Sequence, residues 1–356
     1  MKIMHIVGNR PQFIKLAPVS RAFRKEGFEE VIIHTGQHYD ENMSDVFFDE
    51  LEIPRPTENL HVSGGTHAQM TGEMIKSLED VIERHEPDLV VVYGDTNSTL
   101  AAALTARKLG IKVAHIEAGV RTRVDDNPEE INRKAVDHIV DLLFAPDRQA
   151  LNNLISEGLG DRSYFSGDVM FDAFKYYSLE ENRKKAVSEA NTPEEFVLLT
   201  WHHQENTDNK SRMNEILDFI KMIPSKVVCP LHPRTKKMLE AFDLWDKASG
   251  LANLMFIDPV GYLEIIDLLN RSKWVATDSG GLSKEAYYAK KKCIYLFEFV
   301  VWKDLEDSGW IKHIGNDAAK AISNMYEDNK LEADKMYYGN GDASQVIVDT
   351  LRKVFD

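Results

Sequence analysis

Short apolar stretches rich in β-branched residues recur along the first half of the chain, separated by polar turns. Continuous apolar runs of this length are typical of strands buried on both faces of a parallel sheet. The predicted strands are residues 2–7, 31–34, 89–93, 112–116 and 142–144. Between them, stretches such as 66–84 and 99–109 repeat apolar residues with the period of a helix. This alternation predicts a doubly wound α/β domain.

The same alternation returns in the second half, after a polar, charge-rich stretch at 178–195 that we interpret as the linker. The predicted strands there are residues 196–200, 227–231, 254–257, 275–277 and 293–296, with helices such as 208–222. We therefore predict two Rossmann-like α/β domains, 1–177 and 178–340, with a C-terminal helix at 341–356 packed on the first. Because open parallel sheets bind ligands beyond the carboxyl ends of their strands, we expect these loops to face one cleft.

Composition agrees with this organisation and excludes several classes of partner. A chain of 356 residues with 43% hydrophobic and 28% charged residues is ordinary for a globular protein and long enough for two domains. The net charge of −15 disfavours binding to nucleic acid or to anionic membranes, so neither is an expected partner. Any phosphate group must instead be met by a local basic or backbone site.

No apolar run is long enough to span a bilayer. The apolar start is followed by Arg10 and Lys15 instead of a small-residue cleavage site, so we expect a cytoplasmic protein whose first residues form a strand. Cys229 and Cys293 are predicted to be buried, reduced thiols. No residues have the spacing of metal ligands, so no metal site is expected.

The loop GNRPQFIK follows the first predicted strand. Gly8 permits a tight turn and Pro11 favours a helix start, while Arg10 and Lys15 supply positive charge. Helix N–H groups, the helix dipole and a guanidinium together predict an anion site, although a capped surface helix with two solvated cations fits equally well. The loop is not a dinucleotide fingerprint, so no bound NAD is expected.

Two carboxylates end neighbouring strands of the first half. Asp95 follows the strand at 89–93, where Asn97 and Ser98 are available to cap the next helix and leave Asp95 for another role; capping by Asp95 itself is the simpler alternative. Glu117 follows continuous apolar sequence, where an unpaired charge would be costly. Burial beside other carboxylates would raise its pKa towards the range useful for proton transfer.

Pro128 is predicted to begin a helix with Glu129 and Glu130 in its first turn. Acidic residues suit the helix dipole at this position, and that explanation suffices for Glu129. Glu130 and Arg133 lie three residues apart on one helical face. They act together in the cleft or form a surface ion pair, and the spacing alone leaves both open.

In the second half, His202 and His203 directly follow a strand. Histidine titrates near neutral pH, so acid–base work or phosphate contact is favoured over zinc, for which no third ligand has suitable spacing. His232 and Arg234 follow another strand, either at the cleft or in a solvated basic loop.

The segment TDSGGLSKEA has the form strand, tight turn, helix. Ser279, Gly280 and Gly281 would let backbone amides approach a phosphate closely, which predicts a phosphate cradle. Glu285, further along the predicted helix, is placed to receive the hydroxyls of a ribose; the alternative is an exposed helical glutamate.

In this order, the motifs resemble the non-hydrolysing UDP-N-acetylglucosamine 2-epimerase family from residue 1 to about 353. The motifs are GNRPQFIK, HTGQHYDENM, GDTNSTLAAAL, HIEAGVRT, PEEINR, CPLHPRTKK, IDPVGYLE, DSGG with KEA, and YGNGDAS. Their details are most similar to the branch that converts UDP-2,3-diacetamido-2,3-dideoxyglucuronate to its manno epimer. The resemblance implies a glycosyltransferase-B type architecture, a homodimer, and elimination and re-addition of UDP through a glycal without a cofactor.

The resemblance also implies roles for the candidate residues. The acid–base group would comprise Asp95, Glu117, Glu130 and His202. Residues that bind the UDP-2-acetamido sugar would be Arg10, Lys15, Arg133, His232, Ser279, Gly280, Gly281 and Glu285. Two other functions fit the same two-domain pattern, a UDP-sugar-dependent glycosyltransferase and a non-catalytic UDP-sugar-binding paralogue.

The sequence departs from the family pattern in two places. His203 replaces an arginine that in some members contacts a second, allosteric UDP-sugar, so such regulation is not expected here. After the cradle, Phe297, Val300 and Val301 precede Trp302 where the family has an arginine and Thr-Glu. Apolar side chains at polar positions remove hydrogen bonds and remodel a pocket, which motivates the non-catalytic alternative.

Overall fold

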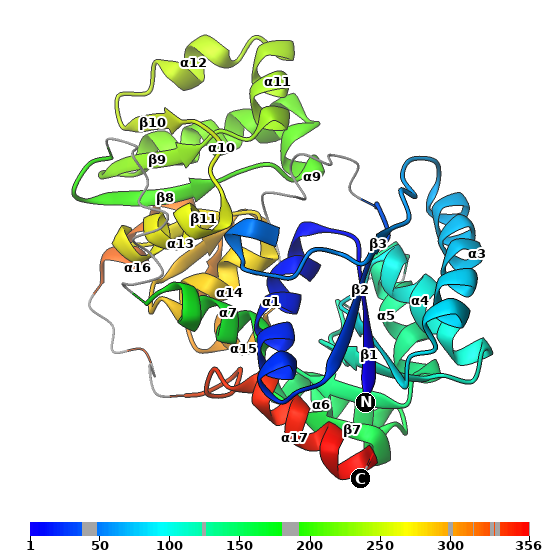
Figure 1. Cartoon of the computed structure of the whole chain (residues 1–356). Helices are drawn as coiled ribbons and strands as arrows, with labels where there is room; N and C mark the ends of the chain where they lie inside the picture. Colours follow the sequence, from blue (N-terminus) through cyan, green and yellow to red (C-terminus); the bar gives the residue numbers. More distant parts are fainter. Residues whose placement is uncertain are drawn as a thin grey trace. The chain divides into compact units, whose positions relative to one another are not determined.

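The computed structural model describes residues 1–37, 48–122, 126–179, 192–297, 302–315, 317–327, 331 and 335–355. The chain divides into a first unit, Met1–Ala173 with Met336–Asp356, and a second unit, Phe174–Lys335 (Figure 1). Each unit is built on its own parallel sheet, and helices alternate with the strands along the chain. This confirms the prediction of two Rossmann-like α/β domains.

The described part of the first unit contains a seven-stranded parallel sheet in the order β3-β2-β1-β4-β5-β6-β7. Its strands are β1 (Lys2–Val7), β2 (Glu29–His34), β3 (Glu58–Asn59), β4 (Leu89–Tyr93), β5 (Lys112–Ile116), β6 (Leu142–Ala145) and β7 (Ser163–Phe165). The strand order changes direction between β1 and β4, which pair directly. The loops that follow these two strands therefore diverge at a topological switch point, where such sheets bind ligands.

The helices of the first unit follow the strands in sequence. They are α1 (Arg10–Lys25), α3 (His67–His85), α4 (Asn97–Lys108), α5 (Pro128–Ile139), α6 (Arg148–Ser156) and the C-terminal α17 (Ala343–Phe355), with a short 3₁₀ turn, η1 (Gly160–Arg162). Helix α17 lies beside α1 (Figure 1), and Arg352 forms an ion pair of 2.6 Å with Glu26, which follows α1. The last helix of the chain thus belongs to the first unit.

A further helix, α7 (Val169–Tyr177), contains the boundary between the units after Ala173. The segment that returns to the first unit, Met336–Asp356, is hydrogen-bonded to the start of α7 and to Asp168 before it. The Asp168 N–H donates to the Tyr338 carbonyl at 3.0 Å, and Asp172 of α7 accepts from the N–H groups of Ala343 and Ser344. The two segments that connect the units are therefore tied together.

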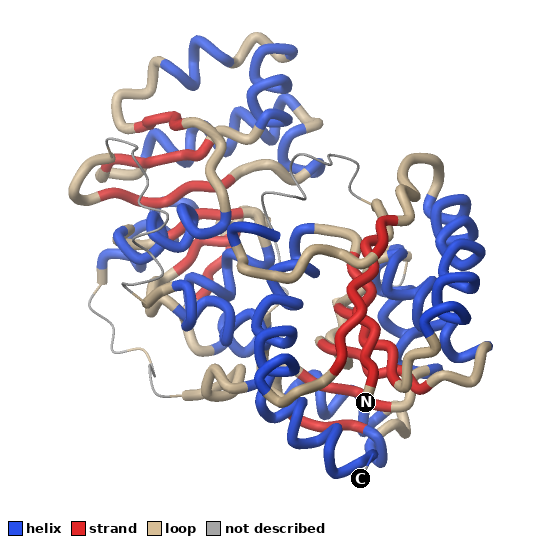
Figure 2. The backbone as a smooth tube through the Cα atoms, viewed as in Figure 1, coloured by secondary structure: helices blue, strands red, loops and turns tan. Residues whose placement is uncertain are grey.

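The second unit contains a six-stranded parallel sheet within its described residues, in the order β10-β9-β8-β11-β12-β13 (red in Figure 2). Its strands are β8 (Phe196–Thr200), β9 (Lys226–Pro230), β10 (Leu254–Ile257), β11 (Val275–Thr277), β12 (Cys293–Tyr295) and β13 (Ile311–His313). Its helices are α9 (Gln204–Thr207), α10 (Lys210–Met222), α11 (Pro233–Ala241), α12 (Trp245–Ser249), α13 (Tyr262–Arg271), α14 (Gly280–Tyr288), α15 (Lys303–Asp307) and α16 (Ala318–Tyr326). The switch point lies between β8 and β11.

Large buried side chains fix the sheet of the second unit. Trp201 and Trp274 are each 1% exposed and belong to a cluster of buried residues that also includes the inner face of α10. In the first unit, alanines supply the buried face of α4, and small side chains let this helix pack closely against β4. Cys229 and Cys293 are buried free thiols, and burial raises the pKa of Cys229 to about 12.

Candidate active site

The turn between β1 and α1 is tied to the end of β4 by one glutamine. Asn9 caps α1 and accepts a hydrogen bond from the Gln12 N–H at 3.2 Å. The Gln12 side chain accepts from the Gly8 N–H at 2.7 Å and donates to the Tyr93 carbonyl at 2.9 Å. A methyl group at Gly8 would lie 2.2 Å from Thr35 Oγ1, so this close approach requires glycine. The loop predicted to bind an anion is thus anchored beside the loop that carries Asp95.

Glu117 lies at the end of β5 and forms a buried ion pair with Lys15 of α1. The Lys15 ammonium is 2.7 Å from Glu117 Oε1, and both side chains are at most 8% exposed. A methyl group built at Gly94 would lie 3.1 Å from Lys15 Nζ, so the pair lies against the residue that precedes Asp95. Lys15 therefore contacts a carboxylate, whereas Arg10 is the half-buried first residue of α1.

The backbone of Glu117 is also unusual. Its φ of 71° is in the left-handed region, which a residue with a side chain adopts at an energetic cost. The N–H groups of Glu117 and Ala118 both donate to the Phe144 carbonyl, at 3.1 and 3.0 Å, so β6 holds the turn in this conformation. Strain of this kind persists only where surrounding contacts fix it, and it clusters at functional sites.

Asp95, Arg133 and Glu130 form a second group of charges at the same edge of the sheet. A short ion pair joins Arg133 Nη2 to Asp95 Oδ2, and Arg133 Nη1 lies 3.8 Å from Glu130 Oε2. That oxygen also accepts from Thr122 N and Oγ1, both at 2.8 Å. Glu130 is 1% and Arg133 8% exposed, so the alternative of a surface ion pair is wrong.

The cap of α4 differs from the prediction. Thr96, not Asn97 or Ser98, is the capping residue, and its side chain accepts from the Thr99 N–H at 3.3 Å. Ser98 Oγ instead donates to Gln37 Oε1 at 2.7 Å, and the side chain of Asn132 donates to the Asp95 carbonyl at 2.9 Å. Asp95 therefore does not cap α4, as expected, but the residue that caps it is Thr96.

In the second unit, Asp278 at the end of β11 organises the loop after β8. It accepts hydrogen bonds from the backbone N–H groups of His202 and His203 at 3.0 and 2.8 Å, and it is 1% exposed. The His202 ring also faces it, with 3.4 Å between Nδ1 and Oδ1. This carboxylate therefore orients both the backbone and the ring of His202. The sequence prediction did not include Asp278.

The remaining histidines have distinct neighbours. The His232 ring centroid is 5.2 Å from that of His202, and His232 caps α11, accepting from the Arg234 N–H at 3.1 Å. Arg234 Nε donates to Thr207 Oγ1 at 2.9 Å and lies in the first turn of α11, so the alternative of a solvated basic loop is wrong. His203 Nδ1 lies 3.2 Å from Glu205 Oε2, and its ring meets that of Phe297 edge-on, with 5.1 Å between the centroids.

The predicted phosphate cradle forms the first turn of α14. Ser279 is the capping residue and accepts from the Leu282 N–H at 3.3 Å, so Gly280 and Gly281 begin the helix with N–H groups at its positive end. Trp302 Nε1 donates to the Gly280 carbonyl at 2.8 Å, and the ammonium of the buried Lys284 lies 4.2 Å from the Trp302 ring centroid. The tryptophan that follows the divergent segment therefore supports the cradle.

Glu285 is also part of this region. It is 4% exposed and accepts a hydrogen bond from the Tyr262 hydroxyl at 2.8 Å, so the alternative of an exposed helical glutamate is wrong. Val300 and Val301, predicted to replace polar residues of the family, lie outside the described residues.

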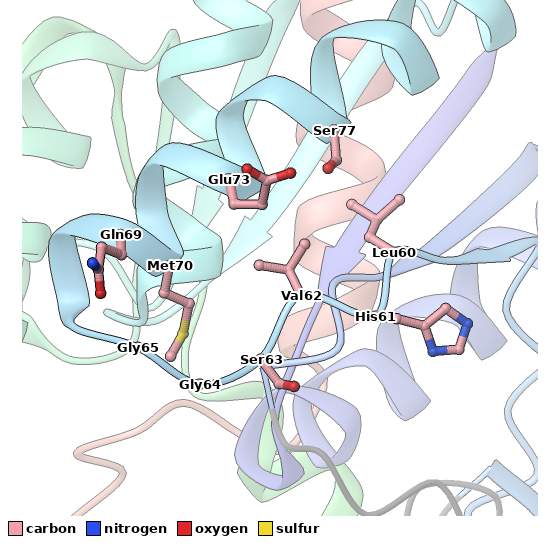
Figure 3. A pocket seen from close by; sticks show the side chains of 10 residues that line it. All are labelled: Leu60, His61, Val62, Ser63, Gly64, Gly65, Gln69, Met70, Glu73 and Ser77. Carbon is pink, nitrogen blue, oxygen red and sulfur yellow. The ribbon is translucent and has the colours of Figure 1, made fainter.

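A separate hollow of about 540 Å³ opens in the first unit between the loop after β3 and α3 (Figure 3). It is lined by Leu60, His61, Val62, Ser63, Gly64, Gly65, Gln69, Met70, Glu73 and Ser77. None of the predicted site residues lines it. Among the described residues, no three His, Cys, Asp or Glu side chains gather as metal ligands, and no helix is long and apolar enough to cross a membrane.

The geometry shows which candidates come together. In the first unit, Lys15, Asp95, Glu117, Glu130 and Arg133 lie at the carboxyl ends of β4 and β5 and at the start of α5. In the second unit, His202, His232 and Ser279 lie around the end of β11. Buried carboxylates paired with cations, a histidine oriented by an aspartate, and a helix start open to anions are the parts of an acid–base enzyme for a phosphate-containing substrate.

Comparison with known proteins identifies this class more narrowly. Residues 21–352 match the family model described as UDP-N-acetylglucosamine 2-epimerase. The chain is 45% identical to a UDP-N-acetylglucosamine 2-epimerase homolog of Methanococcus maripaludis, over 99% of this chain and all of that protein. It is 42% identical to the UDP-2,3-diacetamido-2,3-dideoxy-D-glucuronate 2-epimerase of Pseudomonas aeruginosa, again over 99% of this chain and all of the relative.

Solved structures agree. The crystal structure of the Methanocaldococcus jannaschii UDP-GlcNAc 2-epimerase in complex with UDP-GlcNAc and UDP matches with a TM-score of 0.86 and 38% identity, covering 99% of this chain and all of that one. The chain therefore belongs to the UDP-N-acetylglucosamine 2-epimerase family, whose members are isomerases.

Proposed function

We propose that the protein inverts C2 of a UDP-2-acetamido sugar by elimination and re-addition of UDP. A base removes the C2 proton while the C1–O bond breaks and UDP departs with the bonding electrons, which leaves a glycal. Return of a proton to the opposite face of C2 and of UDP to C1 completes the epimerisation. The reaction is redox-neutral, so it consumes no oxidant or reductant.

The observation that carries this proposal is the pair of charged groups in the first unit. Glu117 and Asp95 are carboxylates on adjacent loops, each held by its own cation, Lys15 or Arg133. Two positioned carboxylates offer one group for each face of C2, as inversion through a glycal requires. We propose that Glu130 and His202 complete the acid–base group.

The second unit supplies the proposed nucleotide site. The start of α14 at Ser279, Gly280 and Gly281 would bind the diphosphate, and Glu285 the ribose hydroxyls. Arg10 and His232 would contact the phosphates from their own loops. Relatives of this chain are named for UDP-N-acetylglucosamine and for UDP-2,3-diacetamido-2,3-dideoxy-D-glucuronate, which supports both sugars as candidate substrates.

We also propose that the protein is a homodimer. Light scattering of the purified protein tests this.

The decisive experiment follows the proton at C2. The purified protein is incubated in deuterium oxide with UDP-N-acetylglucosamine and, separately, with UDP-2,3-diacetamido-2,3-dideoxyglucuronate, and NMR monitors C2. We expect deuterium at C2 together with the manno epimer for the true substrate. Absence of exchange with either sugar, combined with tight UDP binding, would support the non-catalytic alternative that Phe297, Val300 and Val301 motivate.

Two conservative variants test the roles of the carboxylates. Asp95→Asn and Glu117→Gln remove a negative charge without removing bulk, and both residues belong to the first unit, whereas α14 and Glu285, proposed to bind the diphosphate and ribose, belong to the second. We expect each to lower exchange at least about a hundredfold, as loss of an acid or base does, while UDP affinity changes little. Normal exchange in both variants would refute this assignment, and isothermal titration with UDP provides the binding measurement.

A further inference from the structure

His115 is a fully buried histidine in β5, two residues before Glu117. Its Nδ1 is 2.7 Å from Asp137 Oδ1, and its Nε2 is 2.7 Å from the Gly94 carbonyl oxygen. A carbonyl oxygen accepts hydrogen bonds and never donates, and the same holds for an ionised carboxylate. Because both neighbours are acceptors, this geometry favours a proton on each ring nitrogen, that is, a cationic ring.

The surroundings of Asp137 keep its carboxylate ionised. Its second oxygen accepts from the Gly119 N–H at 3.0 Å and from Arg121 Nη1 at 2.8 Å. Burial alone would raise the pKa of Asp137, but the hydrogen bonds and charges of His115 and Arg121 outweigh it and hold the pKa below its usual value. Because the Gly119 N–H and the Arg121 guanidinium both donate to Asp137 whatever the state of His115, a protonated Asp137 that donates to a neutral His115 is disfavoured.

Charge balance supports the same protonation state. Arg121 also forms an ion pair of 2.7 Å with Glu157, so a cationic His115 gives a cluster of two positive and two negative groups. A neutral His115 would leave one unbalanced negative charge. Three of the four side chains are at most 8% exposed, and an unbalanced charge at such a site is costly.

This cluster holds the loops of both proposed carboxylates. Gly94, the residue before Asp95, has a φ of 64°. Its N–H donates to the Ile116 carbonyl at 3.0 Å, and its carbonyl accepts from the His115 ring, so two residues of β5 hold its backbone in place. Asp137 binds the Gly119 N–H, two residues after Glu117. We propose that His115, as an imidazolium, is a positioning residue that fixes Asp95 relative to Glu117; this inference rests on the proposed function.

Two variants separate the two hydrogen bonds of the ring. In His115→Gln the amide reaches the former position of Nε2 and keeps a donor for Gly94, whereas in His115→Asn it replaces Nδ1 and keeps only the bond to Asp137. We expect His115→Asn to lower the turnover number on the order of a hundredfold, as small displacements of catalytic groups do, with little change in UDP affinity. His115→Gln should retain clearly more activity. Wild-type turnover in His115→Asn, or equal losses in both variants, would overturn the proposal.

The protonation state has its own readout, independent of activity. In protein with ¹⁵N-labelled histidine, the ring signals of His115 are assigned by their loss in His115→Gln. At about pH 8 an ordinary histidine, with a pKa near 6.5, is neutral. We expect the two His115 nitrogens to keep the shifts of an imidazolium there. Chemical shifts of a neutral tautomer would refute the proposal that His115 is an imidazolium.

His5 provides a matched control in the same sheet. It is fully buried in β1, and its ring contacts the Tyr93 hydroxyl at 2.8 Å and Glu30 at 3.0 Å. His5→Asn should lose thermal stability yet keep most of its turnover; a fall equal to that of His115→Asn would mean that any buried histidine has the same effect. If the wild-type protein shows no exchange at C2, the proposed function fails, while the spectra still decide the charge of His115.

Discussion

The geometry of the His202 loop depends on one carboxylate, that of Asp278. In Asp278→Asn an NH₂ group replaces one of the oxygens that accept from the N–H groups of His202 and His203. Leaving a buried donor unsatisfied costs about 1–3 kcal/mol, and the His202 ring loses its charged partner. We expect turnover to fall on the order of a hundredfold through misplacement of His202. Steady-state kinetics of C2 epimerisation give this value.

The control for this prediction is Asp218→Asn, which changes an exposed aspartate of the same unit that pairs with Lys247. A surface ion pair contributes about 0–1 kcal/mol, so this variant should keep wild-type kinetics. If Asp278→Asn also turned over normally, the orientation of His202 would not depend on the carboxylate.

At the scale of residues, the sequence predicts which residues belong to the site better than it predicts which residues they contact. Glu117 is predictable because an unpaired charge directly after an apolar strand would be costly, and Asp95 because other side chains of its loop are able to cap the next helix. The ion pair between Lys15 and Glu117 is not, because it joins residues 102 positions apart through strands that are not neighbours in the sheet. Asp278 lies inside the motif that predicts the phosphate cradle, and it directly follows β11, which is the same signal that selects Glu117.

At the scale of elements, the start of α17 depends on a residue far away in sequence. Asp172 accepts from the N–H groups of Ala343 and Ser344 at 2.9 and 2.7 Å and from the Ser344 hydroxyl at 2.6 Å. Asp172→Ala leaves these donors without their acceptor. Loss of a helix cap costs about 0.5–2 kcal/mol, and we expect a decrease of that size in the free energy of unfolding, measured with urea.

Asp349→Ala, on the exposed side of α17, is the matched control, since it removes only a contact with Gln345 on the same helix. We expect a change below about 0.5 kcal/mol, as is usual for surface substitutions. Equal losses in the two variants would show that the cap does not anchor the helix.

The elements that the sequence predicted are those with long or strongly apolar patterns. The strands at 2–7, 89–93, 112–116 and 196–200 match the structure to the residue. In contrast, β3, β7 and β13 have only two or three residues and include polar ones, so they lack the apolar pattern that predicts the equally short β11 (Val275–Thr277). They depend on pairing with a neighbouring strand. Helix α11 begins directly after His232, where the sequence analysis considers the chemistry of His232 and Arg234 and predicts no helix.

At the scale of the whole molecule, the number of units follows from chain length and repeated alternation, but the order of strands does not. Both sheets place the first strand of their unit in the interior, with later strands added on either side. That order decides which loops are neighbours, and it brings Gly8 beside Tyr93 through Gln12. The right-handed crossover rule limits the possible orders without selecting one.

The stability of the molecule in acid provides a test that combines these scales. The pKa of Asp137 is depressed because His115 and Arg121 outweigh the effect of burial. A depressed pKa means that the folded state binds this proton less readily than the unfolded chain, in which the pKa is about 3.9. The stabilisation from Asp137 is therefore fully present above about pH 4 and is lost as the pH falls through the lower, folded value.

The chain carries 58 acidic residues, so other carboxylates also titrate in this range and the wild-type curve alone does not isolate Asp137. The comparison of interest is Asp137→Asn with Asp80→Asn, an exposed aspartate of α3 in the same unit. Urea unfolding at a series of values from about pH 6 to pH 3 should give a free energy that falls less steeply below pH 4 in Asp137→Asn than in the wild type. Asp80→Asn should follow the wild-type slope. Equal slopes in all three proteins would mean that the charge on Asp137 is not coupled to folding. The ion pairs of Asp137 with His115 and Arg121 would then not stabilise the folded state.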